Sequence, residues 1–376
     1  MSSSWFFLSL PCSNPFPNQV DMTKIVRYLL LLLLSFPSCQ EPEVSYVNLD
    51  PVTVEEPREA LPPDGNVVVG YMTYWDTTLP DVSLLTHICY AFAHIKSDFA
   101  SLDVKNESRL ASIAALKEKK PELKVLLSVG GWGAGNFSEM AADERTRSRF
   151  CNNCLEVVKK YGLDGIDLDW EYPTSSVAGI SSSSEDTRNF TLLLKNLREV
   201  LGNDRLITMA SADNAKYVDF RSAVFYLNFV NVMAYDMGRP PYHNAALHPS
   251  EMSQMSCEEA VNLHYKAGVP YGKIVLGIPF FGRADGKAFG GEDEVAFRDI
   301  STKGYVVKWD ETAQVPYLTD KDGVMVLTYD DEKSVGLKAD YIREKELLGA
   351  MYWNVEADNA SWTLSKAIAS RLLSKK

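Results

Sequence analysis

Residues 164–173 read Asp-Gly-Ile-Asp-Leu-Asp-Trp-Glu-Tyr-Pro, a segment in which apolar and acidic residues alternate. Successive side chains of a β-strand point to opposite faces, so Asp167, Asp169 and Glu171 share one face of a strand formed here. Same-face neighbours on a strand lie about 7 Å apart, and no Lys or Arg within the segment offsets these negative charges. Repulsion at that distance raises some of the carboxyl pKa values, which is typical of acid–base sites. A merely solvated acidic face is the alternative interpretation.

Short apolar runs and helical patterns alternate on both sides of this segment. The runs with strand character are Val67–Tyr74, His87–Ala93, Lys124–Val129, Gly165–Glu171, Leu206–Ser211, Phe229–Tyr235, Ile274–Pro279 and Leu348–Trp353. The helical patterns are Glu107–Lys119, Asp143–Tyr161, Ser184–Leu201, Cys257–Ala267, Glu332–Glu346 and Trp362–Leu373. A repeated strand-then-helix order indicates a parallel sheet, and eight strands close a (β/α)8 barrel, a TIM barrel, which we predict for residues 66–376. An open, doubly wound sheet is the alternative; it is disfavoured because no glycine-rich phosphate fingerprint follows the first strand.

The segment between the seventh and eighth predicted strands has a different character from the rest of the barrel. Residues from about 284 to 328 are charged and punctuated by glycine. One hairpin is expected within them, pairing Val306–Trp309 with Val324–Thr328. We therefore predict a short insertion at this point of the barrel.

Aromatic residues and carboxylates recur at or just past the ends of the predicted strands. The active site of a barrel lies at the carboxyl ends of its strands. These positions hold Trp75, Trp132, Glu171 with Tyr172, Tyr235 with Asp236, and Trp353. Sugars present C–H faces and hydroxyl groups, for which aromatic rings and carboxylates are a suitable lining. The pattern therefore indicates a carbohydrate site, although each ring taken alone is more often a core residue.

The composition of the chain limits its classes of partner. The 376 residues carry a formal net charge of −12, whereas binding of a polyanion requires a basic surface, so we predict no nucleic-acid partner. The histidines and cysteines do not show metal-ligand spacing. The pair Cys151-x-x-Cys154 lacks a second pair, and we interpret it as two ordinary helix thiols. We predict no metal site and no organic cofactor.

The amino-terminal part of the chain has the features of an export signal. Lys24 and Arg27 precede a leucine-rich run that is too short to span a bilayer but has the length of a signal-peptide core. We predict a leader at residues 1–38, whose end resembles a loose bacterial lipoprotein box in which Cys39 is lipidated after cleavage. Residues 39–65, rich in Pro, Glu and Asp, would form a flexible tether. The expected location is the bacterial cell envelope, as an outer-membrane or periplasmic lipoprotein, or the medium, with the lipid anchor as the only membrane contact.

The acidic segment resembles the Asp-x-x-Asp-x-Asp-x-Glu signature of glycoside hydrolase family 18, which holds chitinases and endo-β-N-acetylglucosaminidases, and all four acids match. Further motifs extend the resemblance over Val67–Trp362. Ser128-Val-Gly-Gly131 looks like the third-strand motif of the family, and Met233-Ala-Tyr-Asp236 looks like its sixth-strand motif. The aromatic residues that match those of the first, second and eighth strands are Tyr71, Phe92 and Trp353.

The resemblance implies retaining, substrate-assisted hydrolysis of β-1,4 bonds that follow N-acetylglucosamine. Glu171 would protonate the leaving oxygen while the acetamido group of the substrate itself attacks C1 to give an oxazolinium ion. Asp169 would orient the acetamido nitrogen, and Asp167 would share a proton with Asp169. Tyr235 and Asp236 would hold the acetamido group from the opposite wall. The expected substrate-binding residues are Tyr71, Phe92, Gly131, Trp132, Tyr172, Met233 and Trp353.

Asp164 stands at an odd offset from the other three acids, so we interpret it as structural, closing the turn before the strand. The expected partner is a β-1,4-linked N-acetylglucosamine oligosaccharide or polysaccharide, such as chitin, bound by a monomer. One alternative is an endo-β-N-acetylglucosaminidase acting on the chitobiose core of N-glycans. The other is a non-hydrolytic glycan-binding protein on the same barrel, which is disfavoured because every acid of the signature is present.

Overall fold

The computed structural model describes residues 65–374. The predicted leader at residues 1–38, the predicted lipidation of Cys39 and all but the last residue of the predicted tether lie outside the described residues. Among the described residues, no helix combines the length and the apolar character that a membrane span requires.

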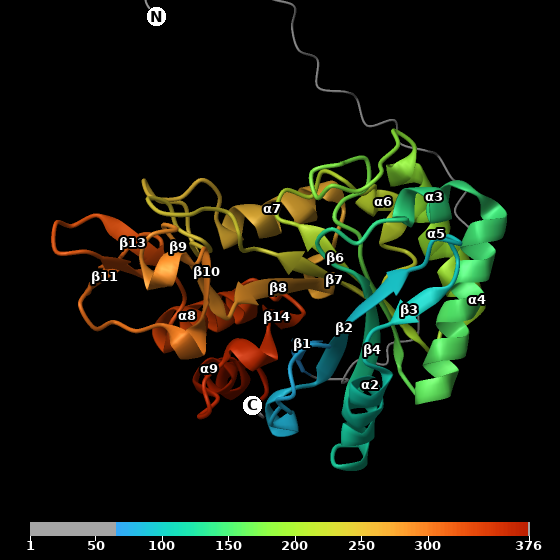
Figure 1. Cartoon of the computed structure of the whole chain (residues 1–376), viewed down its shortest axis with the longest axis horizontal. Helices are drawn as coiled ribbons and strands as arrows, with labels where there is room; N and C mark the ends of the chain where they lie inside the picture. Colours follow the sequence, from blue (N-terminus) through green and yellow to red (C-terminus); the bar gives the residue numbers. More distant parts are fainter. Residues whose placement is uncertain (1–64, 375–376) are drawn as a thin grey trace, which may run out of the picture. The chain divides into compact units, whose positions relative to one another are not determined.

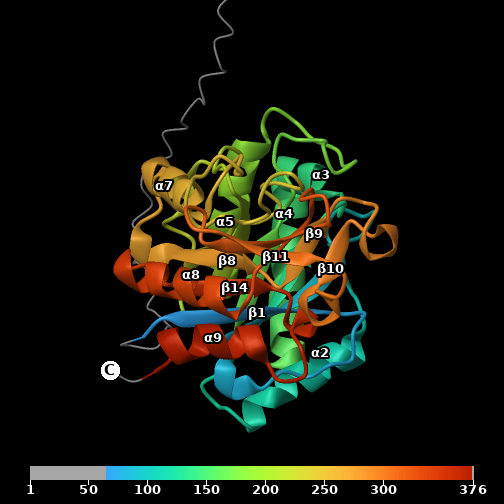
Figure 2. The ribbon, with the colours of Figure 1, turned by 90° about the vertical axis from the view of Figure 1, so that its left-hand side faces the viewer.

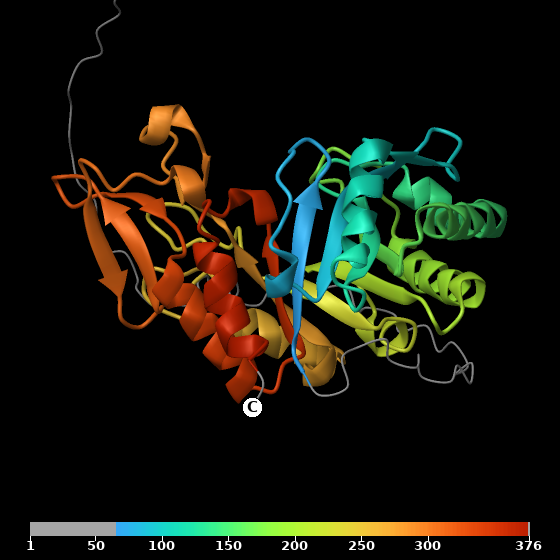
Figure 3. The same ribbon diagram turned by 90° about the horizontal axis from the view of Figure 1, so that it is seen from below.

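Parallel strands of the described chain close into a ring, which Figure 1 shows and Figure 3 shows from below. Their order around the ring follows the sequence, and the ring closes because β1 pairs with both β2 and β14. The strands are β1 Val67–Thr73, β2 His87–Ile95, β4 Lys124–Gly130, β5 Gly165–Asp169, β6 Leu206–Ala212, β7 Phe229–Met233, β8 Ile274–Pro279 and β14 Gly349–Trp353. A short strand, β3 (Leu102–Val104), pairs antiparallel with the end of β2. The predicted (β/α)8 barrel is confirmed, and the alternative of an open sheet is excluded.

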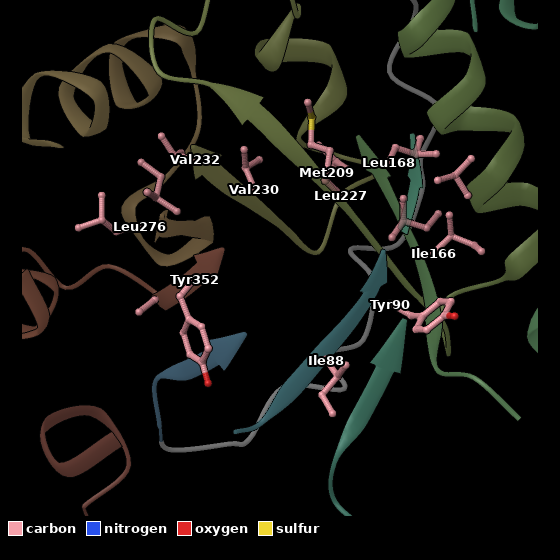
Figure 4. Packing of buried hydrophobic residues seen from close by; sticks show 14 of the residues in the cluster. Ile88, Tyr90, Ile166, Leu168, Met209, Leu227, Val230, Val232, Leu276 and Tyr352 are labelled. Atoms are coloured by element: carbon pink, nitrogen blue, oxygen red, sulfur yellow. The ribbon is translucent and has the colours of Figure 1, made fainter. Parts of the chain in front are cut away.

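The barrel strands are rich in apolar residues because both of their faces are covered. Val69 and Tyr71 of β1 belong to a cluster inside the ring, whereas Met72 packs with residues of the surrounding helices. Figure 4 shows part of this outer layer, including Ile166 and Leu168 of β5. The same alternation turns the acidic positions of β5 toward the interior of the ring, where they are buried.

The helices lie outside the ring of strands (Figures 1 and 3). Several begin at a residue whose side chain accepts a backbone N–H of the first turn, as Asp143 does for α4 and Ser256 for α7. The helices are α2 Glu107–Ala114, α3 Phe137–Ala142, α4 Glu144–Tyr161, α5 Asp186–Leu201, α6 Phe220–Ala223, α7 Cys257–Ala267, α8 Glu332–Glu344 and α9 Thr363–Leu372.

The predicted helices are confirmed, with small changes at their ends. The pattern at Glu107–Lys119 divides into α2 and a 3-10 turn, η2 (Ala115–Glu118). The sequence pattern does not indicate α3 and α6, because these helices of 6 and 4 residues are too short to repeat a helical period. Cys151 and Cys154 lie buried in α4 as free thiols, and burial raises the pKa of both.

A second, antiparallel sheet separates β8 from β14 in the sequence and occupies the region predicted as an insertion. Figure 2 turns this sheet toward the viewer. Its strands are β9 Phe281–Ala284, β10 Glu294–Ala296, β11 Val306–Asp310, β12 Val315–Thr319 and β13 Met325–Thr328.

The hairpin predicted inside the insertion is wrong. Val306–Trp309 pairs with β12, and β13 pairs with the other edge of β12. The sequence pattern hides β12 because it contains Pro316, and proline lacks the N–H that an interior strand donates. Pro316 pairs with Trp309 of β11 but lies outside the ladder with β13, which begins only at Tyr317. The proline is tolerated because β12 has a partner on one side only at this position.

Candidate active site

A cavity of about 970 Å³ opens at the carboxyl ends of the barrel strands. Asp169, Met233 and Trp353, the last residues of β5, β7 and β14, line it. The insertion contributes Arg283 of β9 and Glu294 of β10 to the wall. The cavity is therefore shared by the barrel and the insertion, and its size is typical of a ligand site.

The Asp167 carboxylate is fully buried and accepts hydrogen bonds from side chains of four other strands. The donors are Tyr71 (2.8 Å), Ser128 (2.8 Å), Thr208 (2.5 Å) and Asn231 (3.3 Å). Burial raises the pKa of Asp167, and these hydrogen bonds oppose the shift.

The sequence prediction placed Tyr71 at the substrate, named Ser128 only as part of a motif, and did not include Thr208 or Asn231. The structure places the Tyr71 hydroxyl on Asp167. Ser128 and Thr208 lie directly beside Asp167 in the neighbouring strands. A signal was present, because polar residues at inward positions of otherwise apolar strands need a partner inside the barrel.

Asp169 follows Asp167 on the same face of β5 and is also buried. Its Oδ1 atom has no hydrogen-bond partner among the described residues. Burial raises its pKa well above the ordinary value, and the negative charges of Glu171 and then of Asp167 add to the shift. A buried polar atom without a partner costs free energy. A ligand that donates a hydrogen bond to Asp169 would recover that free energy.

Glu171 lies beyond the end of β5 and lines the cavity. The predicted strand end at Glu171 is wrong, because pairing with β6 stops at Leu168 and pairing with β4 stops one residue later. The inward and outward alternation nevertheless continues. Trp170 points outward, where it stacks on Phe137 with ring centroids 5.2 Å apart and meets Phe190 edge-on at 5.9 Å.

The environment of Glu171 keeps its carboxyl group protonated at higher pH than usual. Burial raises the pKa of Glu171 to about 7, and the negative charge of Asp236 adds to the shift. A hydrogen bond with Tyr172 opposes it. Near neutral pH a large fraction of Glu171 therefore carries the proton that a general acid must deliver.

Tyr235 and Asp236, which follow β7, also line the cavity. The Tyr235 hydroxyl lies 4.0 Å from the Sδ atom of Met351. Arg283 donates to the Asp236 carboxylate from Nε (2.5 Å) and Nη2 (2.7 Å), and its Nη1 lies 3.2 Å from Glu294. Sequence reasoning did not select Arg283 or Glu294 as site residues, because only the folding of the insertion brings them to the cavity.

One group of aromatic rings forms the floor of the cavity around Trp353. Tyr71 lies 5.8 Å from it, Phe92 stacks on it at 5.7 Å, and Trp75 lies 6.5 Å away, all between ring centroids. Gly131 belongs here because a Cβ atom at its position would lie 2.6 Å from the Phe92 ring, and its φ of +96° disfavours other residues.

A second group of rings lies on the side of Glu171. The Trp132 and Tyr172 centroids are 6.5 Å apart, and Tyr217 stacks nearly parallel on Tyr172 at 4.7 Å. Trp132 is 63% exposed, so its position is not explained by core packing. Tyr217 and His94 also line the cavity, although the sequence prediction included neither.

Asp164 lies at the other end of β5, outside the cavity. Its carboxylate accepts the backbone N–H of Val125 at 2.9 Å and the Lys117 ammonium at 2.7 Å. These contacts join the start of β5 to β4 and to η2. No group of three or more His, Cys, Asp or Glu side chains in residues 65–374 is arranged to hold a metal ion.

TIM-barrel enzymes that hydrolyse sugars need a proton-holding carboxyl group and ring faces at the carboxyl ends of their strands. The described barrel supplies both, and it is a glycoside hydrolase by fold and site. Residues 67–358 match the family described as Glycosyl hydrolases family 18, and the chain belongs to that family.

Relatives with known names are similar over most of the barrel. Chitinase A1 of Niallia circulans is 36% identical over 291 residues, which are 65% of this chain but only 42% of that protein. Probable chitinase 2 of Drosophila melanogaster is 30% identical over 353 residues, 78% of this chain and 72% of that protein. A solved family 18 N-acetylglucosaminidase from Paenibacillus barengoltzii has a TM-score of 0.73 and 34% identity, covering 82% of this chain and 100% of that structure. The chain thus spans less than half of Chitinase A1.

Proposed function

We propose that this protein hydrolyses β-1,4 bonds that follow N-acetylglucosamine in chitin or chitooligosaccharides, with retention of configuration. The observation that carries the proposal is the pair formed by Glu171 and Asp169 in one cavity. Glu171 has its pKa raised to about 7, and the buried Asp169 beside it has an oxygen free to accept a hydrogen bond. The first can deliver a proton and the second can receive an amide N–H.

The reaction would proceed in two steps that involve the acetamido group of the substrate. In the first, the acetamido oxygen attacks C1, the bond from C1 to the glycosidic oxygen breaks, and that oxygen takes the proton of Glu171. In the second, the Glu171 carboxylate takes a proton from water as the water oxygen attacks C1 and opens the oxazolinium ring. Two displacements at C1 retain the configuration.

The other residues of the site would position the sugar. Asp169 would accept the acetamido N–H and hold that group against C1, with Asp167 and its four donors keeping Asp169 in place. Burial raises the pKa of the Tyr235 hydroxyl, and the negative charge of Asp169 adds to the shift, so the hydroxyl would stay a hydrogen-bond donor. The Trp353 ring would stack against the sugar whose glycosidic bond is cleaved.

Other substrates share the same chemistry at the cleaved sugar. The chitobiose core of N-glycans also presents a 2-acetamido group, so an endo-β-N-acetylglucosaminidase is the alternative function. The similarity to a solved N-acetylglucosaminidase makes release of single sugars a third outcome to score. A binding-only protein would keep the rings but would not need the raised pKa of Glu171.

The proposal is tested by hydrolysis of 4-methylumbelliferyl chitobioside by the wild-type protein and by Glu171→Gln. We expect the folded variant to lose about three orders of magnitude in kcat, because the amide holds no acidic proton. Glu118→Gln, which changes an exposed glutamate of η2 in the same way, is the matched control and should keep wild-type activity.

Product analysis then separates the substrates. Cleavage of chitotriose with the β-anomer formed first supports the proposed function. Cleavage of a high-mannose glycoprotein, but not of chitotriose, would instead support the endo-β-N-acetylglucosaminidase function. Equal rates for wild type and Glu171→Gln would show that Glu171 is not the general acid.

A further inference from the structure

A buried ion pair lies beside the cavity but outside the carboxylate cluster. Nη2 of Arg109, on α2, lies 2.7 Å from Oε1 of Glu356, and their side chains are 7% and 3% exposed. Glu356 belongs to η6 (Val355–Ala357), the turn that follows β14. Burying two charges is costly, so such a pair contributes little net stability and more often fixes one arrangement of the chain.

Both charged groups bind the backbone where β1 ends. Glu356 Oε1 accepts the Thr73 N–H at 2.8 Å, and Arg109 Nε donates to the Thr73 carbonyl at 2.7 Å. Arg109 Nη2 also donates to the Thr78 carbonyl at 3.1 Å. The ion pair therefore holds both ends of residues 73–78, the segment that carries Trp75.

Glu356 also lies close in sequence to Trp353, which lines the cavity. Glu356 follows Trp353 by three residues, and Val355 between them packs on β1, where its Cγ2 atom lies 2.6 Å from the point at which a Cβ atom of Gly70 would stand. The Trp75 and Trp353 rings lie 6.5 Å apart. Trp75 is 58% exposed, so core packing does not hold it in place.

Two further residues, Asn106 and Arg298, contact the same segment or Glu356. Asn106, which caps α2, donates from Nδ2 to the Tyr74 carbonyl at 3.0 Å. Arg298 of the insertion donates to the Glu356 carbonyl, and its guanidinium lies 4.0 Å from Asp76. Contacts from α2, from η6 and from the insertion thus meet at the segment that carries Trp75 and at Glu356.

We propose that Glu356 and Arg109 are positioning residues that hold Trp75 beside Trp353, so that the two rings accept sugars of one chain, and Trp75 accepts one that a chitobioside lacks. The proposal rests on the proposed function, since it concerns how the sugar chain is bound. The pair touches neither the reacting atoms nor the carboxylates of β5. Its loss should therefore weaken binding of the longer substrates, which reach Trp75, more than it slows bond cleavage.

The test compares Glu356→Gln with the wild-type protein on 4-methylumbelliferyl chitobioside and chitotrioside. We expect KM for the chitotrioside to rise about tenfold, with KM for the chitobioside and both kcat values within about threefold of wild type. Asp330→Asn is the matched control, because Asp330 also forms a buried ion pair away from this segment, with Lys338 at 2.6 Å. It should lower the melting temperature without changing either KM.

A double-mutant cycle with Trp75→Ala shows whether the effect passes through Trp75. In the Trp75→Ala background, Glu356→Gln should raise KM for the chitotrioside by less than about twofold. Equal increases in both backgrounds overturn the proposal, as does a Glu356→Gln protein that only melts earlier, as Asp330→Asn does.

Failure of the proposed function is recognised separately, because wild type would then cleave neither substrate. In that case the quenching of tryptophan fluorescence by chitotriose provides a Kd for the same set of variants. A tenfold weaker Kd for Glu356→Gln would support the positioning role without catalysis, and absence of binding by wild type would overturn it.

Discussion

Glu171 is the residue whose surroundings most directly predict a pH dependence. Its carboxyl must be protonated to act as the acid, and its pKa is raised to about 7, first by burial and then by the charge of Asp236. We expect kcat/KM to fall as pH rises through about 7. Asp236→Asn removes a negative charge, which lowers the pKa of Glu171, so the fall should begin at lower pH. A pH profile whose basic limb does not move in this variant would contradict the electrostatic explanation.

Asp167 predicts a stability effect at the same scale. Thr208 donates to it at 2.5 Å from the adjacent strand. Thr208→Val keeps the shape and removes the donor, and a hydrogen bond to a carboxylate is worth about 1.5–3 kcal/mol. Urea denaturation should show a loss of that size in the free energy of unfolding. Thr312→Val, at an exposed turn, should change it by less than about 0.5 kcal/mol. Equal losses in the two variants would show that the hydrogen bond to Asp167 is not the cause.

The end of β5 packs against α3 and α5, two helices that contribute no residue to the lining of the cavity. Trp170 lies between two residues of the site and packs outward on α3 and α5 through Phe137 and Phe190. Because the strand ladder has already ended at Asp169, we expect this packing to fix the direction of Glu171. The register of the site therefore depends on the outer layer of helices.

Trp170→Ala tests this dependence. We expect a loss of about 3–5 kcal/mol in the free energy of unfolding from the cavity that remains. We also expect kcat to fall at temperatures where the variant is folded. Trp309→Ala, on an edge strand of the insertion, loses an exposed contact with Lys333 and an exposed hydrogen bond to Glu311, and should cost about 1 kcal/mol. Full activity of folded Trp170→Ala would show that Glu171 is oriented without it.

The net charge of the whole chain bears on how it binds its proposed substrate. The chain carries a net charge of −12, yet the proposed substrate is neutral. Salt screens interactions between charges, and a neutral substrate offers no charge to screen. KM should therefore change less than about twofold between about 50 mM and about 500 mM NaCl. Kinetics on a chitooligosaccharide at several salt concentrations provide the measurement. A steep dependence of KM on salt would indicate a charged substrate instead.

Much of the fold and of the site was predictable because it depends on periods along the chain. The alternation of β5 places Asp167 and Asp169 inward and Trp170 outward whatever its neighbours are. The order of strands and helices limits the topology to a parallel sheet with crossovers, which eight strands close. The signature of four acids indicated the family. These features need only local sequence and the geometry of strands.

The rest was decided by contacts between residues far apart in the chain. Pro316 concealed β12, whose place is set by pairing on both of its edges. Thr208 and Asn231 became partners of Asp167 only when neighbouring strands brought them to one level of the barrel. The sequence by itself determined which residues could face the interior and which acids could act. The tertiary structure decided which of them meet and what pKa each has, because burial and neighbouring charges exist only once the ring has closed.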